Sequence, residues 1–144
     1  YKVGGSHQHT PEMEQTLSAA AGEPVTVSFT PLLAPMPRGI LATSSADLAE
    51  GATTEDLREC LHAAYAAECF VHVLPDGQWP QTSSTLGGNA VHVQAAADAR
   101  TGRAVVVSAL DNLVKGAAGQ ALQNANLMLG LDEASGISDT GVAP

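Results

Sequence analysis

Residues 90–110 read AVHVQAAADARTGRAVVVSAL, and the fold class follows from this segment. Two runs rich in Val and Ala, residues 90–95 and 104–110, flank a polar linker that contains Thr101-Gly102. Strand-forming runs on either side of a short linker with a glycine predict a β-hairpin. The stretch therefore predicts an antiparallel sheet.

Three more strands are expected around this hairpin. Residues 25–30 alternate apolar and polar side chains, which is typical of a strand. A segment with three prolines follows, and residues 39–44 then resume as a strand. Residues 70–74 form a short strand that ends at the turn Pro75-Asp76-Gly77.

Three helices complete the expected architecture. The first starts at Thr10, which can cap it, and stops at Gly22. The second starts at Thr53 or Thr54. Its expected buried stripe is Leu57, Leu61, Ala64 and Tyr65. The third is Ala-rich, runs over residues 113–129 and stops at Gly130. The fold class is therefore α+β, with a largely antiparallel mixed sheet that the helices cover.

Composition and charge exclude several classes of partner. Hydrophobic residues make up 44% of the chain and charged residues 15%, which favours a folded domain. The net charge of −9 argues against nucleic acid and anionic membranes, since both attract basic surfaces. No apolar run approaches a membrane-spanning length. The two cysteines, Cys60 and Cys69, make no disulfide framework, so we expect a cytoplasmic protein in which both are core residues.

The segment His7-Gln8-His9-Thr10-Pro11-Glu12 precedes the first helix and is the first candidate site. Imidazole is the commonest general acid or base near neutral pH, and the start of a helix favours an anion nearby. Two alternatives without a catalytic role remain, because both histidines could lie in a surface loop or one could cap a turn. A third alternative is a metal site that uses His7, His9 and Glu12.

Two further segments carry candidate residues. A proline-stiffened loop presents Arg38, whose planar fork suits a carboxylate or phosphate, although a solvated loop arginine is equally compatible with the pattern. After the last strand, Asn112 stands at the start of a helix of small residues that contains Gly116 and Gly119. Those glycines cost helix stability, so they indicate close packing or a function. A core helix with a capping Asn is the alternative.

Taken in order, these segments resemble the N-acetyl-γ-glutamyl-phosphate reductase family. The matching stretches are His7 to Glu12, Phe29 to Ile40, Asp111 to Ala121 and the closing Gly141-Val142-Ala143-Pro144. The resemblance implies the fold of the C-terminal domain of glyceraldehyde-3-phosphate and aspartate-semialdehyde dehydrogenases. It also implies an activity: NADPH reduces N-acetyl-γ-glutamyl phosphate to the semialdehyde, with release of phosphate, in arginine biosynthesis. In that family a cysteine thiolate first forms a thioester with the substrate.

The resemblance also implies residue roles. His7 looks like the catalytic histidine. Tyr1, His9, Glu12 and Arg38 resemble substrate-binding residues. Asn112, Lys115 and Gly116 look like residues that bind NADP. No metal is expected. Gln8 departs from the family, which often has a basic residue between the two histidines.

A second departure concerns what the chain lacks. Neither Cys60 nor Cys69 matches the family's Gly-Cys nucleophile, and the dinucleotide-binding half is not in the sequence. The chain starts at Tyr1 without Met, which looks like a cut from a longer polypeptide. We therefore expect a fragment that is inactive alone: a substrate-binding and dimerisation domain at 1–111, and a helix and tail at 112–144 that pack on the N-terminal dinucleotide-binding domain.

The expected partners are a small acyl-phosphate substrate, that N-terminal domain, and further copies of the chain that associate through the sheet. Two other functions stay open, a metal-binding module and a non-catalytic dimerisation domain.

Overall fold

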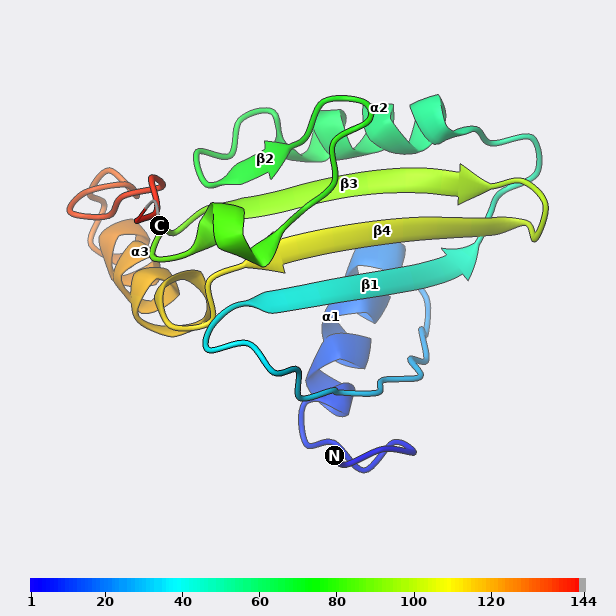
Figure 1. Ribbon diagram of the computed structural model, residues 1–144, viewed down its shortest axis with the longest axis horizontal. Helices are drawn as coiled ribbons and strands as arrows, with labels where there is room; N and C mark the ends of the chain where they lie inside the picture. Colours follow the sequence, from blue (N-terminus) through cyan, green and yellow to red (C-terminus); the bar gives the residue numbers. More distant parts are fainter. Residues whose placement is uncertain (143–144) are drawn as a thin grey trace. The chain divides into compact units, whose positions relative to one another are not determined.

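The computed structural model describes residues 1–142, so Ala143 and Pro144 of the expected C-terminal motif lie outside it. The chain divides into two compact units, the first from Tyr1 to Met36 and the second from Pro37 onward (Figure 1). The domain division expected after Asp111 stays a prediction. Among the described residues no helix is long and apolar enough to cross a membrane.

The first unit contains helix α1, Thr10–Ala21, which confirms the helix expected there. Its N-cap is His9, however, and Thr10 is the first helical residue rather than the cap. The helix ends at Gly22, which has a φ of 74° and so adopts the left-handed conformation that glycine tolerates best.

The strand expected at residues 25–30 is wrong, because within residues 1–142 this segment pairs with no other strand. Its amides bond instead to side chains of α1. The N–H of Val25 donates to Ser18 Oγ, and the N–H of Val27 donates to Glu14 Oε1, both over 2.9 Å. The alternating pattern therefore reflects an extended strap along a helix.

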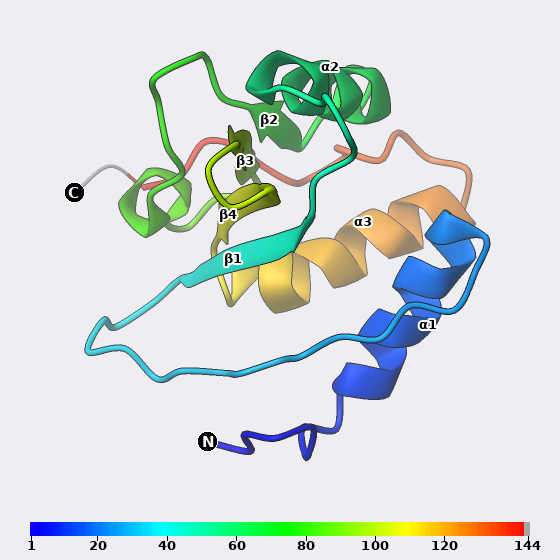
Figure 2. The same ribbon diagram turned by 90° about the vertical axis from the view of Figure 1, so that its right-hand side faces the viewer.

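The second unit is built on a four-stranded sheet of β1 (Ile40–Asp47), β2 (Val71–Val73), β3 (Val91–Asp98) and β4 (Arg103–Leu110). The strand order is β1-β4-β3-β2, and Figure 2 shows the strands stacked in this order. The hairpin β3–β4 and the pair β1–β4 are antiparallel, whereas β2 runs parallel to β3. The mixed, largely antiparallel sheet is therefore confirmed.

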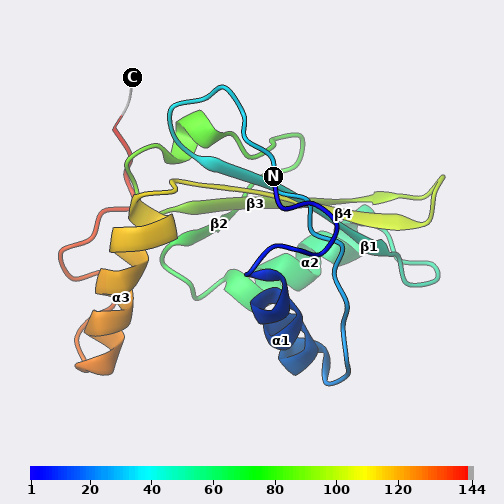
Figure 3. The ribbon, with the colours of Figure 1, turned by 90° about the horizontal axis from the view of Figure 1, so that it is seen from below.

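Helix α2, Thr54–Tyr65, packs on β2 and β3. A capping box starts it, in which Thr53 Oγ1 accepts from the N–H of Asp56 and the Asp56 carboxylate accepts from the N–H of Thr53. Figure 3 shows this helix and the Ala-rich helix after β4 on one side of the sheet, with the short 3₁₀ segment η1, Thr82–Thr85, on the other.

Part of the expected core of α2 is wrong. Leu57 and Leu61 are half-buried, but Ala64 and Tyr65 at the end of the helix are exposed. Both cysteines are exposed too, which contradicts the expectation that they are core residues. The sheet extends only three residues at β2, so the C-terminal turn of α2 has little surface to pack against.

The last helix is not one continuous α-helix. It opens with a π-helical turn η2, Val114–Ala118, and continues as α3, Gly119–Met128. In the π turn the N–H of Gly116 donates to Asp111 O and that of Ala118 to Leu113 O, so each bond spans five residues. Turns of this kind recur at functional sites, which directs attention to the residues around Asp111.

Backbone hydrogen bonds anchor the tail after α3 to the second unit. The N–H of Asn89 donates to Ser138 O and the N–H of Val142 donates to Leu86 O, both over 2.8 Å. Residues 138–142 therefore lie against the loop between η1 and β3. Gly88 and Gly141 allow this approach, because a Cβ at either position would overlap the facing backbone.

Candidate functional site

His7 lies in a cage of rings within the first unit. Its ring centroid is 5.0 Å from those of His9 and Phe29 and 5.8 Å from that of Tyr1, all in edge-to-face arrangements. The residue is only 9% exposed. The segment that precedes α1 supplies His7 and His9, and the extended strap after α1 supplies Phe29. Three aromatic rings therefore flank the buried His7 ring.

The hydrogen bond to His7 fixes which nitrogen carries its proton. The backbone N–H of His9 donates to His7 Nδ1 over 3.2 Å, and a backbone amide can only donate. The neutral ring therefore carries its proton on Nε2. Burial, and after it the positive charges of His9 and Lys2, lower the pKa of His7 below its ordinary 6.5. At neutral pH this site offers an uncharged ring with one N–H donor.

The other residues predicted for this site are more open. Tyr1 is 55% exposed, and His9 and Glu12 are exposed as well. No three His, Cys, Asp or Glu side chains within residues 1–142 are grouped so that they could hold a metal ion. His7, His9 and Glu12 thus do not form the metal site that their order in the sequence allows.

Thr10, for which the sequence suggested only a capping role, is tied to the His7 segment, because its backbone N–H donates to His7 O over 3.1 Å. Its side chain is buried, and its hydroxyl has no hydrogen-bond partner among the described residues. A buried hydroxyl without a partner is uncommon in proteins and suits a polar ligand group. In the sequence, the feature that could have identified Thr10 is its position three residues after His7, on the first turn of the helix.

A second cluster gathers around Asp111, at the end of β4. The Arg38 Nε lies 2.6 Å from Asp111 Oδ2 in an ionic contact, and Arg38 Nη2 donates to Oδ1 over 3.0 Å. Backbone N–H groups of Gly87, Leu113 and Val114 also donate to this carboxylate, over 2.7 to 2.8 Å. Burial by itself raises the pKa of Asp111, but Arg38 and the three amides outweigh it and lower the pKa to about 2.

The predicted cofactor residues come directly after Asp111 in the sequence. The Asn112 Oδ1 accepts a hydrogen bond from the N–H of Gly39 over 2.7 Å, and the side chain is half-buried. Lys115 Nζ donates to Gln123 Oε1 over 2.8 Å and lies 5.4 Å from the centroid of the Phe70 ring. Gly116 is exposed in the π turn. The structure thus brings Arg38 next to the predicted cofactor residues through Asp111.

Cys69 has the wrong environment for a nucleophile. Desolvation, and after it a hydrogen bond and the charge of Glu133, raise the pKa of its thiol above 9.0. Reactive cysteines have a lowered pKa, because the thiolate is the attacking species.

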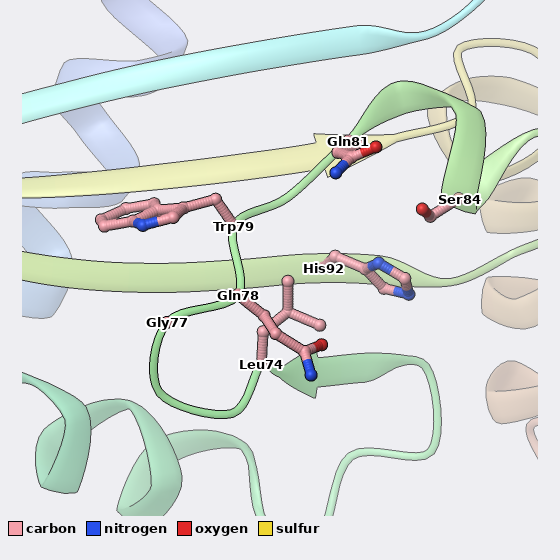
Figure 4. Close-up of a pocket in the computed structure, with 7 residues that line it drawn as sticks. All are labelled: Leu74, Gly77, Gln78, Trp79, Gln81, Ser84 and His92. Carbon is pink, nitrogen blue, oxygen red and sulfur yellow. The ribbon is translucent and has the colours of Figure 1, made fainter.

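A cavity of about 480 Å³ opens on the sheet side of the loop after β2 (Figure 4). Gln78, Trp79 and Gln81 line it from that loop, Ser84 lines it from η1, and His92 lines it from β3. No Lys or Arg is among its lining residues, so it offers no charge to a phosphate. None of the predicted site residues lies there.

Comparison with known proteins gives one family match. Residues 1–112 match the family model described as semialdehyde dehydrogenase, dimerisation domain. The chain is 63% identical to the N-acetyl-gamma-glutamyl-phosphate reductase of Acidothermus cellulolyticus, 65% to that of Frankia casuarinae and 61% to that of Streptomyces coelicolor. Each match covers all 144 residues of this chain but 42% of the relative. The chain therefore spans less than half the length of these relatives.

Proposed function

Because the chain belongs to the family of semialdehyde dehydrogenase dimerisation domains, we propose that it is the substrate-handling part of an NADP-dependent reductase. The proposed reaction converts N-acetyl-γ-glutamyl phosphate and NADPH to the semialdehyde and phosphate, in arginine biosynthesis in the cytoplasm. Identities of 61–65% over the whole chain to reductases of that name support it. The acyl phosphate, an N-terminal dinucleotide-binding domain and further copies of the chain are the proposed partners.

The single observation that carries this proposal is the state of His7. Its proton sits on Nε2, and its lowered pKa keeps the ring uncharged at neutral pH, so that it offers one N–H donor. In the proposed reaction Nε2–H faces the substrate oxygen that gains negative charge when the acyl carbon becomes tetrahedral. A positioned donor of this kind stabilises the transition state.

The substrate pocket around His7 is proposed to include Tyr1, His9 and Glu12. The ring of Tyr1 contacts that of His7 edge-on, and the backbone N–H of His9 donates to the His7 ring. The unpartnered hydroxyl of Thr10 adds a buried polar atom beside them. The nucleophilic thiol is proposed to come from outside this chain, since the raised pKa of Cys69 works against attack.

Asn112, Lys115 and Gly116 are proposed to contact NADP, and their chemistry fits that role. The Asn112 carboxamide can pair with another carboxamide, and Lys115 is a half-buried cation held in place by Gln123. Gly116 leaves its backbone open to close approach at the π turn. When bound, NADPH supplies the hydride; these residues orient it.

The subunit interface is proposed to form on the sheet. Every residue of β1 is exposed, although it is paired along its full length with β4. Thr43 and its partner Val107 point to one face, and Ser44 and Val106 to the other. Light scattering on Thr43→Lys and Ser44→Lys variants tests this, because a buried lysine at the interface dissociates the oligomer. If both variants keep the wild-type mass, the interface lies elsewhere.

The test of the activity uses the complete polypeptide that carries this chain. NADPH oxidation is followed with N-acetyl-γ-glutamyl phosphate as substrate. His7→Ala lowers turnover by roughly 10²- to 10⁴-fold, the usual contribution of a general acid or base. His62→Ala, an exposed histidine on α2, is the matched control and keeps wild-type turnover. If His7→Ala lowers turnover by less than threefold, His7 does not have the proposed role.

A further inference from the structure

Asp111 joins three segments that are far apart in the sequence. Its carboxylate is fully buried and accepts from Gly87, from the first amides of the π turn, and from Arg38. Arg38 reaches it from the loop that leads into β1. Releasing Arg38 leaves a buried carboxylate without its counter-charge, which is strongly unfavourable. Arg38 is therefore not free to turn toward a substrate anion.

The next residue in the same loop contacts the next residue after Asp111. The N–H of Gly39 donates to Asn112 Oδ1 over 2.7 Å, next to the ion pair of Arg38 and Asp111. A backbone N–H only donates, so the amide oxygen of Asn112 faces Gly39 and its amino group faces away. That amino group has no acceptor among residues 1–142.

Position 39 requires a glycine. Its φ is +106°, and a Cβ there would lie 2.8 Å from the Cβ of Thr82. Only glycine combines this backbone conformation with such close packing. With the loop fixed by Arg38 on one side and by Thr82 on the other, the Gly39 N–H has one direction in which to point.

The geometry points to Arg38 as a positioning residue, which acts through Asp111 and Gly39 to turn the Asn112 amino group toward a carbonyl acceptor of the cofactor. The inference rests on the proposed function and deepens it. It replaces the predicted role of Arg38 as a ligand of the substrate. It also makes Asn112 a hydrogen-bond donor, so the group that it recognises is the carbonyl oxygen of the nicotinamide carboxamide rather than the carboxamide nitrogen.

The first experiment needs no activity and uses this chain. Hydrogen exchange of the Gly39 amide is measured by NMR in wild type, Arg38→Ala, Arg38→Lys and Asn112→Asp. Arg38→Ala speeds exchange at Gly39 at least tenfold while β3 amides stay protected, and Arg38→Lys restores part of the protection. Asn112→Asp keeps Gly39 protected, because a carboxylate oxygen still accepts. Arg100→Ala, at an arginine whose side chain is 84% exposed, is the control.

Unchanged exchange at Gly39 in both Arg38 variants overturns the positioning role. If Arg38→Ala does not fold, Arg38→Lys alone decides, because it keeps the charge and loses the planar fork. This readout is independent of the proposed reaction, so it stands even if the complete polypeptide shows no reductase activity.

The second experiment uses the complete polypeptide and two reductants, NADPH and the reduced 3-acetylpyridine analogue, which keeps the carbonyl and lacks the amide NH₂. If Asn112 donates, Asn112→Asp raises KM for both reductants by about 3- to 10-fold, the value of one lost hydrogen bond. If Asn112 instead accepts from the carboxamide NH₂, the variant keeps its KM for NADPH, and the donor assignment fails.

Arg38→Ala separates positioning from substrate binding in the same assay. As a positioning residue, Arg38 affects KM for NADPH by about 3- to 10-fold and leaves KM for the acyl phosphate within twofold. The reverse pattern makes Arg38 a substrate ligand and overturns the proposal. A wild-type polypeptide without activity refutes the proposed function instead.

Discussion

The backbone N–H of His9 donates to Nδ1 of His7 over 3.2 Å, and this one bond sets the chemistry of the ring. Protonation at Nδ1 would bring two N–H groups face to face and lose the bond. This hydrogen bond therefore disfavours the charged ring and lowers the pKa of His7, as burial also does. His7 is held as a neutral donor at the start of α1, a state that neither the sequence motif nor the helix alone specifies.

The pKa of His7 gives the first prediction. An NMR titration of this chain finds the pKa of His7 below 6.5, because burial and the charges of His9 and Lys2 disfavour protonation. His9→Gln raises the pKa without bringing it to 6.5, since the burial remains. His62→Gln, on α2, leaves it unchanged. A wild-type pKa at or above 6.5 contradicts the enclosed ring.

The same pKa affects stability. The folded state binds protons less readily than the unfolded state, so the contribution of His7 is fully present above pH 6.5 and is lost as pH falls toward the folded pKa. Urea unfolding at a series of pH values shows a shallower loss of stability below pH 6.5 in His7→Gln than in wild type. Parallel curves for the two proteins contradict this linkage.

Asp111→Asn destabilises the second unit. The substitution leaves Arg38 without its buried partner, which costs about 3 kcal/mol or more at pH 7. The pKa of Asp111 is about 2 against 3.8 in a free chain, so its contribution is present above pH 3.8 and disappears as pH falls toward 2. Chemical unfolding measures both effects. Asp76→Asn, at a carboxylate that is 93% exposed, is the control and changes stability by less than about 0.5 kcal/mol.

Two glycines of the last helix respond differently to alanine. A Cβ at Gly119 would overlap Asn89 Oδ1 and lie 2.7 Å from Val114 Cγ1. Gly119→Ala therefore destabilises by about 1–3 kcal/mol, the usual cost of overpacking. At Gly116 the nearest atom is 3.4 Å away, so Gly116→Ala is tolerated and gains helix propensity. Thermal unfolding compares the pair, and equal effects contradict the packing at Asn89.

The reactivity of Cys69 tests whether this chain contains the nucleophile. In a Cys60→Ser background, alkylation of Cys69 titrates with a midpoint above pH 9.0, because desolvation and Glu133 raise its pKa. Glu133→Gln lowers that midpoint and speeds alkylation at pH 8. A midpoint near 7 in wild type would indicate an activated thiol and bring Cys69 back as a candidate.

Local patterns in the sequence predicted most elements of the second unit. The hairpin of β3 and β4, the capped start of α2 and the stop at Gly130 follow from residues a few positions apart, because turns, caps and strand alternation are local properties. The same reasoning failed at residues 25–30. An alternating pattern indicates an extended chain but not its bonding partner, and here the partner is a helix.

Residue types at short spacing were enough to predict the family, the sheet and the candidate residues. The contacts that those residues make with one another are visible only in the folded chain. Arg38 and Asp111 are 73 positions apart, and only their contact shows that the arginine is engaged with a buried carboxylate. The hydrogen bond from Gly39 to Asn112 also joins residues 73 positions apart. Each depends on which donor meets which acceptor in space, and residue order does not encode that.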